Sequence, residues 1–304
     1  MKITAVLLAS VFSTLFTPTS SATVAANGMA VPEVTVASTT GLSISQDASS
    51  AYVDKCDNPN SNVLITQAAM IQISDAATGT QGFIALDRDK KEVVVAFRGS
   101  ESLLDAYMDV KFDLVPFVVS NIGGPQGVKV HQGFLQAWNG VAKTVNTVVR
   151  EYLKDGYTLV ITGHSLGGAI ASLAGITLNQ DLTIRTGGVR IYTYGQPRTG
   201  NVKYAEWVNK YIGTANMFRV VNFDDPIPHL PFRTQKLDYL HHGTEYWSFT
   251  VSPSAMNTKK CQSVGEDPKC SGPSPYIRPN PTRTPHRSYF GLKNGLPYCT
   301  KETT

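Results

Sequence analysis

Hydrophobic and polar residues along this chain follow two periods, one typical of buried strands and the other of amphipathic helices. Short apolar runs bounded by glycine or charged turns predict strands at 68–74, 82–87, 92–97, 157–162, 189–194 and 217–223. Apolar residues spaced three or four apart predict helices at 45–53, 134–153 and 202–212, and a run of small residues predicts another at 168–178. This alternation predicts an α/β fold with a mostly parallel central sheet and helices on both faces.

The stretch 101–117 fits neither period cleanly. Its apolar residues Leu103, Leu104, Tyr107 and Met108 stand at helical spacing among acidic residues. On spacing alone, this pattern favours an ordinary amphipathic surface helix over a mobile lid.

The first residues have the pattern of a secretory signal peptide. Lys2 precedes an apolar run at 5–16, and small residues follow at 20–22. We therefore expect a signal peptide at 1–22, an N-terminal arm or pro-segment at 23–40, and a single α/β domain at 41–304. No later segment has 18 uninterrupted apolar residues, so we predict an extracellular protein without a transmembrane segment.

Length and charge narrow the class of protein further. The 304 residues suffice for one large domain, and the net charge of +4 is spread along the chain. A nucleic-acid groove would need a clustered basic stripe, so we expect no nucleic-acid partner. Oligomeric state leaves no signal in this pattern, and a monomer is the default expectation.

Four cysteines in a chain with a secretory signal predict two disulfides. Three pairings are open to them. Cys261 and Cys270 enclose a short loop that closes easily, which leaves Cys56 to pair with Cys299. The cysteines lack the CxxC spacing of zinc sites, so we expect no metal.

The strongest chemical signal is Gly163-His164-Ser165-Leu166-Gly167, between a predicted strand and a predicted helix. A Gly-x-Ser-x-Gly sequence in that context indicates a nucleophilic serine on a sharp turn, where side chains at the glycine positions would collide. Ser165 is therefore the candidate nucleophile. Such a serine needs a histidine to take its proton and a carboxylate to orient that histidine, in the chain order Ser, acid, His.

Chain order sorts the histidines and the acids. His131 and His164 precede the serine, and the residue between Gly and Ser should point away from the site, so both are interpreted as structural. His229, His241, His242 and His286 remain, and His286 is favoured because it follows a proline-rich loop near the C-terminus. Asp224 and Asp225 directly follow a predicted strand, and the residues alone leave the choice between them open; Asp238 and Glu245 are weaker candidates.

Seven motifs together resemble the fungal class 3 lipases, secreted α/β-hydrolases that include the type A feruloyl esterases. The resemblance covers about 51–299 and implies the α/β-hydrolase fold. The motifs are Phe97–Ser100, Val130–Phe134, Gly163–Gly167, Tyr194–Asn201, Asp225–Pro231, Glu245–Trp247 and His286–Leu292.

The resemblance assigns roles residue by residue. It selects Asp225 as the acid, although this chain has Asp224 where the family usually has asparagine, and it supports His286 as the base. His241 and His242 match a structural motif. The resemblance also implies an oxyanion hole formed by Ser100 and the backbone N–H of Leu166, with no cofactor.

The resemblance changes the reading of 101–110, because the family carries a lid just after the oxyanion residue. It implies a serine esterase for lipid esters at an oil–water interface. Some of the chain lengths between motifs are closer to those of the feruloyl esterases. The alternative assignment is therefore a feruloyl esterase or a general carboxylesterase. We favour an acylglycerol lipase because the lid segment is apolar and because Phe112 replaces a tyrosine that feruloyl esterases use for the phenolic ring. The expected lid and substrate-binding residues are Leu103, Leu104, Tyr107, Met108 and Phe112.

Overall fold

The computed structural model describes only part of the chain, and all structural statements below concern that part. The described ranges are residues 48, 51, 71–88, 90–100, 112–120, 122–153, 156–182, 188–250, 257–272, 284–290 and 292–293. All lie within the unit formed by residues 33–304, which is separate from a second unit at 1–32. The expected signal peptide and arm, most of the 45–53 helix, the lid at 101–110, Cys56 and Cys299 lie outside these ranges. The single domain at 41–304 stays a prediction.

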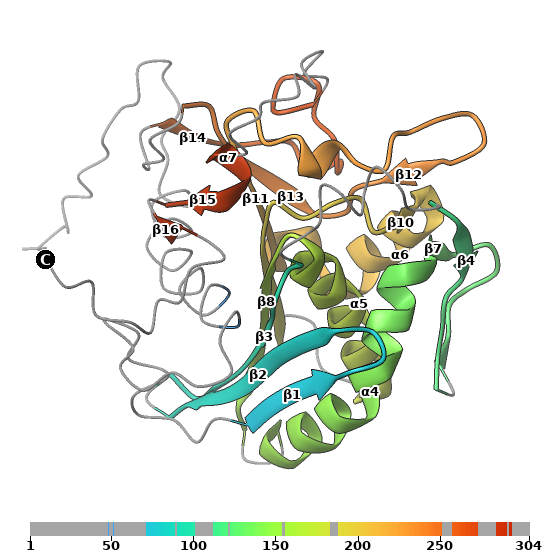
Figure 1. Cartoon of the computed structure of the whole chain (residues 1–304), viewed down its shortest axis with the longest axis vertical. Helices are drawn as coiled ribbons and strands as arrows, with labels where there is room; N and C mark the ends of the chain where they lie inside the picture. Colours follow the sequence, from blue (N-terminus) through green and yellow to red (C-terminus); the bar gives the residue numbers. More distant parts are fainter. Residues whose placement is uncertain are drawn as a thin grey trace, which may run out of the picture. The chain divides into compact units, whose positions relative to one another are not determined.

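An eight-stranded sheet forms the centre of the fold, in the order β1-β2-β3-β8-β9-β11-β13-β14 (Figure 1). The pairings β3–β8, β8–β9, β9–β11 and β11–β13 are parallel, whereas the strands at both edges pair antiparallel. The predicted mostly parallel sheet is thus confirmed. Its strands are β1 (Ile71–Asp75), β2 (Thr80–Asp87), β3 (Glu92–Phe97), β8 (Thr158–His164), β9 (Val189–Tyr194), β11 (Met217–Asn222), β13 (Thr244–Ser248) and β14 (Thr258–Lys260).

Three long helices pack on one side of this sheet: α4 (Gln132–Leu153), α5 (Leu166–Asp181) and α6 (Val202–Ile212) (Figure 1). Alternate sheet residues such as Val95 and Ile161 join the main core under these helices. The intervening residues face the opposite side, where Ala51 packs with Phe83, Ala85 and Ala96. Of the predicted early helix the structure describes Ala48, which is helical, and Ala51.

Helix α5 follows the candidate nucleophile and is almost entirely buried. Its small residues permit this close approach: a Cβ on Gly175 would lie 2.4 Å from the Cδ1 of Ile191 on β9. Because a helix that is apolar on all sides gains stability only when it is enclosed, α5 is fixed between the sheet and its neighbouring helices. The turn at its N-terminus is therefore held in place.

Short strands and turns that periodicity did not predict complete the described fold. A four-stranded sheet has the order β12-β10-β7-β4, and β4 shows that the C-terminal end of the 101–117 stretch is extended rather than helical. No described helix has the length and apolarity needed to cross a membrane. The remaining elements are β4 (Leu114–Pro116), β5 (Val118–Val119), β6 (Ile122–Gly123), β7 (Lys129–His131), β10 (Gly200–Asn201), η1 (Thr214–Asn216), η2 (Ile227–His229), β12 (Tyr239–Leu240), α7 (Thr284–Arg287), β15 (Ser288–Tyr289) and β16 (Leu292–Lys293).

Candidate active site

Ser165 lies on the sharp turn between β8 and α5. Its φ is +59°, a left-handed value that non-glycine residues rarely adopt, and the residue is fully buried. The flanking glycines make the turn possible. A Cβ on Gly163 would lie 2.2 Å from the backbone of Gly167, and a Cβ on Gly167 would lie 2.2 Å from the carbonyl oxygen of Phe97. The expected steric reason for both glycines therefore holds in this structure.

The structure brings Ser165, His286 and Asp225 into one hydrogen-bonded chain. Ser165 Oγ lies 2.7 Å from His286 Nε2, and His286 Nδ1 lies 3.0 and 2.9 Å from the two carboxylate oxygens of Asp225. The three residues come from the ends of β8 and β11 and from α7, which Figure 1 shows near the end of β11. Asp225, not Asp224, is the carboxylate that contacts this ring within the described ranges.

The surroundings of Asp225 keep it ionised. Burial alone raises the pKa of its carboxyl, but His286 and hydrogen bonds from the Tyr289 hydroxyl and the Ile227 N–H outweigh burial, so the pKa lies below its ordinary value. A buried carboxylate of this kind can orient an imidazole and stabilise its protonated form.

Gly195 follows β9 and lies against both Asp225 and His286. Its φ is +60°, and a Cβ at this position would lie 2.9 Å from Asp225 Oδ2 and 2.9 Å from His286 Nδ1. The glycine of the Tyr-Gly-Gln-Pro motif therefore leaves room for the imidazole and the carboxylate to meet.

The two expected oxyanion donors lie close to the serine turn. Ser100 comes three residues after β3, whose last residue, Phe97, pairs with Gly163 in the neighbouring strand. Leu166 is the first residue of α5, where backbone N–H groups lack helical partners and the helix dipole is positive. The N-terminus of α5 suits a developing negative charge, and the role of each residue remains a proposal.

His131, His241 and His164 contact backbone groups, and the contact of His164 corrects an expectation from the sequence. His131 Nδ1 accepts hydrogen bonds from the N–H groups of Gly133 and Phe134 at the start of α4. His241 donates to the Pro228 carbonyl at 2.6 Å. The expectation that His164 points away from the site is wrong, because its Nε2 lies 2.7 Å from the His286 carbonyl oxygen.

A second serine–histidine contact lies deeper in the core. Ser172 Oγ on α5 lies 2.6 Å from His242 Nε2 and 2.6 Å from the Tyr204 hydroxyl. Within the described residues, His242 Nδ1 has no hydrogen-bond partner, so no carboxylate orients this ring. Burial, with the nearby Arg219, lowers the pKa of His242 to about 3. This pair therefore lacks the acid that activates a serine.

Phe112 is the one expected lid or substrate-binding residue within the described ranges. It is half-buried against the main core, with its ring centroid 6.2 Å from that of His131. Sequence reasoning assigned no role to Tyr289 or Asn222, which contact Asp225 and the His286 segment. Tyr289 stands in the matched Tyr-Phe-Gly segment, and that position was the available signal for it.

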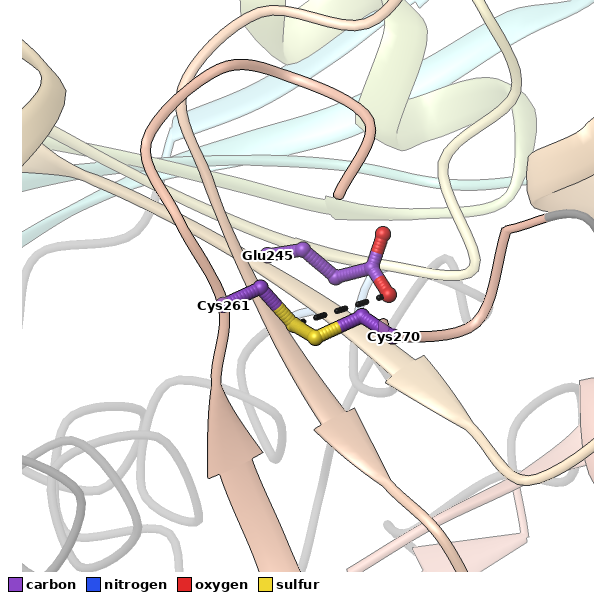
Figure 2. Close-up of side chains that lie close together, drawn as sticks. All are labelled: Glu245, Cys261 and Cys270. Atoms are coloured by element: carbon purple, nitrogen blue, oxygen red, sulfur yellow. Dashed lines mark hydrogen bonds between the residues drawn. A yellow bond between two sulfur atoms is a disulfide. The ribbon is translucent and has the colours of Figure 1, made fainter. Parts of the chain in front are cut away.

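Glu245, Cys261 and Cys270 form the one group of three potential metal-binding side chains in the described part of the chain (Figure 2). The two cysteines are joined by a disulfide, so neither sulfur is a thiolate ligand. Glu245 Oε1 lies 3.9 Å from the Cys261 sulfur and accepts the Ser271 N–H at 3.0 Å, while Oε2 accepts from Arg219 at 3.1 Å. These groups anchor the 261–270 loop to the sheet.

Comparison with known proteins agrees with this architecture. The family model described as "Lipase (class 3)" matches residues 94–235. The Rhizomucor miehei lipase is 34% identical over 73% of this chain and 57% of its own length. The Fusarium solani secreted mono- and diacylglycerol lipase 1 is 36% identical over 56% of this chain and 48% of its own length. A solved fungal lipase–inhibitor complex, described as a model for interfacial activation in lipases, aligns with a TM-score of 0.72 and 30% identity over 86% of this chain and 97% of that chain.

An α/β-hydrolase sheet with a serine on a glycine-flanked turn thus defines the class of this protein. The chain belongs to the class 3 lipase family. The matched part of the chain spans about half the length of the two curated relatives, 57% and 48%.

Proposed function

We propose that this protein is a secreted serine esterase that hydrolyses acylglycerol ester bonds at an oil–water interface. The observation that carries the proposal is the continuous contact from Ser165 through His286 to the buried, ionised Asp225. Membership of the class 3 lipase family and the similarity to a relative named as a secreted mono- and diacylglycerol lipase support the substrate class and the extracellular location.

In the proposed acylation step, His286 Nε2 takes the proton of Ser165 while Oγ attacks the ester carbonyl carbon. The carbonyl oxygen becomes an oxyanion, and the N–H groups of Ser100 and Leu166 are its proposed donors. His286 then gives its proton to the departing glycerol oxygen, which leaves as an alcohol, and the acyl group remains on Ser165.

Deacylation repeats these steps with water as the nucleophile. His286 takes a proton from the water, the hydroxide oxygen attacks the acyl-enzyme, and the proton returns to Ser165 as the fatty acid leaves. Asp225 stabilises the protonated imidazole in both halves, and the mechanism consumes only ester and water. We propose that no metal or other cofactor takes part and that the protein acts as a monomer.

The choice of acylglycerols over ferulate esters rests on the sequence of the lid and on Phe112. The segment 101–110 carries Leu103, Leu104, Tyr107 and Met108, which suit contact with lipid. Phe112 supplies no hydroxyl to hydrogen-bond a phenolic ring. A pocket that lacks this polar group gives little preference for ferulate esters over other esters.

The nucleophile is tested by labelling with a serine-directed phosphonate. Ser165→Ala should lose both labelling and ester hydrolysis while remaining folded. Ser172→Ala is the matched control because it removes a second serine that contacts a histidine in the described part of the chain, and it should keep the activity. Labelling at Ser172, or wild-type turnover by Ser165→Ala, would reject the assignment.

The substrate class is tested by measuring the initial rate against tributyrin concentration through its solubility limit, with methyl ferulate measured in parallel. A rate that jumps when droplets form, together with slow ferulate hydrolysis, supports a lipase that acts at interfaces. Smooth saturation below the limit with rapid ferulate turnover would identify a feruloyl esterase instead.

A further inference from the structure

The segment that carries His286 is held on the sheet by two buried side chains. We propose that Asn222 and His164 are positioning residues that fix the backbone of residues 285–288, so that the His286 ring reaches Ser165 and Asp225 together. This inference rests on the proposed function, because it assigns the two residues a part in that reaction.

The need for such contacts follows from the size of α7. A helix of four residues cannot satisfy its own last carbonyl groups, and a buried carbonyl without a partner is unfavourable. The carbonyl oxygens of Pro285, His286 and Ser288 all accept hydrogen bonds from side chains at the ends of sheet strands. The backbone on either side of the catalytic ring is therefore set by the sheet.

Asn222 supplies two of these hydrogen bonds. Its Nδ2 lies 3.1 Å from the Pro285 carbonyl oxygen and 2.7 Å from the Ser288 carbonyl oxygen, and the residue is 3% exposed. Because both partners are acceptors, only the NH₂ group of the amide can face them. One side chain thus holds the residue before His286 and the residue two places after it.

His164 supplies the third hydrogen bond, from the last residue of β8. Its Nε2 lies 2.7 Å from the His286 carbonyl oxygen, and the two imidazole rings lie 4.6 Å apart. Burial is the main cause that lowers the pKa of His164 to about 3, so the ring is neutral at physiological pH. Since a carbonyl can only accept, the single proton of this neutral ring must be on Nε2.

The end of β11 thereby positions both the acid and the base. Asn222 is its last residue and holds the backbone around His286, while Asp225, three residues on, contacts the imidazole. The turn between them passes through Phe223 at φ +47°. This left-handed residue is tied to β13: its N–H donates to the Ser248 carbonyl at 2.7 Å, and its carbonyl accepts from Trp247 Nε1 at 2.9 Å.

The variant Asn222→Leu removes both donors without adding charge, and Asn222→Asp keeps the shape but opposes two carbonyls with a carboxylate. The matched control is Asn216→Asp, just before the other end of β11, because Asn216 Nδ2 also donates to a helix-end carbonyl, that of Ile212 at 2.8 Å. The measurements are kcat and KM on a soluble p-nitrophenyl ester, together with the unfolding midpoint. Each kcat is divided by the number of active sites, which is counted by phosphonate labelling carried to completion.

We expect both Asn222 variants to lose about 10²-fold in kcat per labelled site with KM changed by no more than about twofold, because small misplacements of a catalytic group cost rate rather than binding. Asn216→Asp should keep kcat. Counting only labelled sites removes any contribution from unfolded protein. If Asn222→Asp and Asn222→Leu do not fold, Asn222→Ser, which keeps one donor, replaces them in the same comparison.

His164→Phe, which keeps a ring but not the donor, extends the test. The double variant of His164 and Asn222 should lose less than the product of the two single losses, because both act on the same segment. Wild-type kcat per site in the Asn222 variants, or losses that multiply in the double variant, would overturn the proposal. Failure of the proposed function itself gives a different result, since wild-type protein would then show neither labelling at Ser165 nor ester hydrolysis.

Discussion

Gly195 offers a direct test of the packing around the site, through the variant Gly195→Ala. Its added methyl group would lie 2.9 Å from His286 Nδ1 and Asp225 Oδ2, whereas ordinary contacts begin at 3.4 Å. The ring or the carboxylate must therefore move by about 0.5 Å, the difference between those distances. A shift of that size in the ring would take the Ser165–His286 contact from 2.7 Å to the limit of a good hydrogen bond.

The expected loss in kcat is about tenfold, since a displacement near 1 Å costs about 10²-fold. The φ of +60° adds a cost of about 1 kcal/mol in stability once a Cβ is present. Gly79→Ala separates the two effects, because Gly79 has a φ of +67° with nothing within 4 Å of the new Cβ.

The assay is hydrolysis of a soluble ester per phosphonate-labelled site, with urea unfolding measured alongside. Gly195→Ala should lose at least as much stability as Gly79→Ala, because it adds a collision to the cost of the positive φ, and only Gly195→Ala should lose kcat. Full kcat in Gly195→Ala would show that the site tolerates the methyl group. An equal kcat loss in Gly79→Ala would show that activity follows stability, and either result refutes the steric argument.

Three further predictions concern protonation and the disulfide. Tyr289→Phe removes a hydrogen bond to the ionised form of Asp225, so the pKa of Asp225 should rise and the acidic limb of the kcat/KM profile should move to higher pH; an unchanged limb would contradict this role. Burial is the main cause that lowers the pKa values of His131, His164 and His242 to about 4, 3 and 3. The unfolded chain therefore binds more protons below pH 6.5, and stability should fall from there toward pH 4 by about 1.4 kcal/mol per pH unit per histidine. Urea unfolding at pH 7.5 and 5 measures this fall, and a flat profile would refute it. Replacing Cys261 and Cys270 by serine opens a short loop and should cost about 2–3 kcal/mol in urea unfolding, whereas an unchanged midpoint would show that Glu245 and its partners hold the loop alone.

Much of this protein follows from local sequence pattern. The strands at 92–97 and 189–194 and the helix at 202–212 lie where periodicity predicts them. The need for Gly163 also follows locally, because its added Cβ would collide with the backbone of Gly167, four residues on. The collision at Gly167 is instead with Phe97 of the distant strand β3, so the fold determines that part of the turn. Periodicity and the exclusion at Gly163 act between residues close in the chain, so the sequence alone reveals both.

Other features depend on contacts between distant residues. The β12-β10-β7-β4 sheet consists of strands of two or three residues, too short to show a period. Asp224 and Asp225 are equivalent on residue type alone, and the fold decides between them by which carboxylate meets a histidine 61 residues away. Likewise, the contacts of His164 and Asn222 with the His286 segment can be recognised only once α7 is placed against the strand ends. The physical reason is that hydrogen bonds to a backbone carbonyl need only a donor at the right place, and tertiary packing alone determines that place.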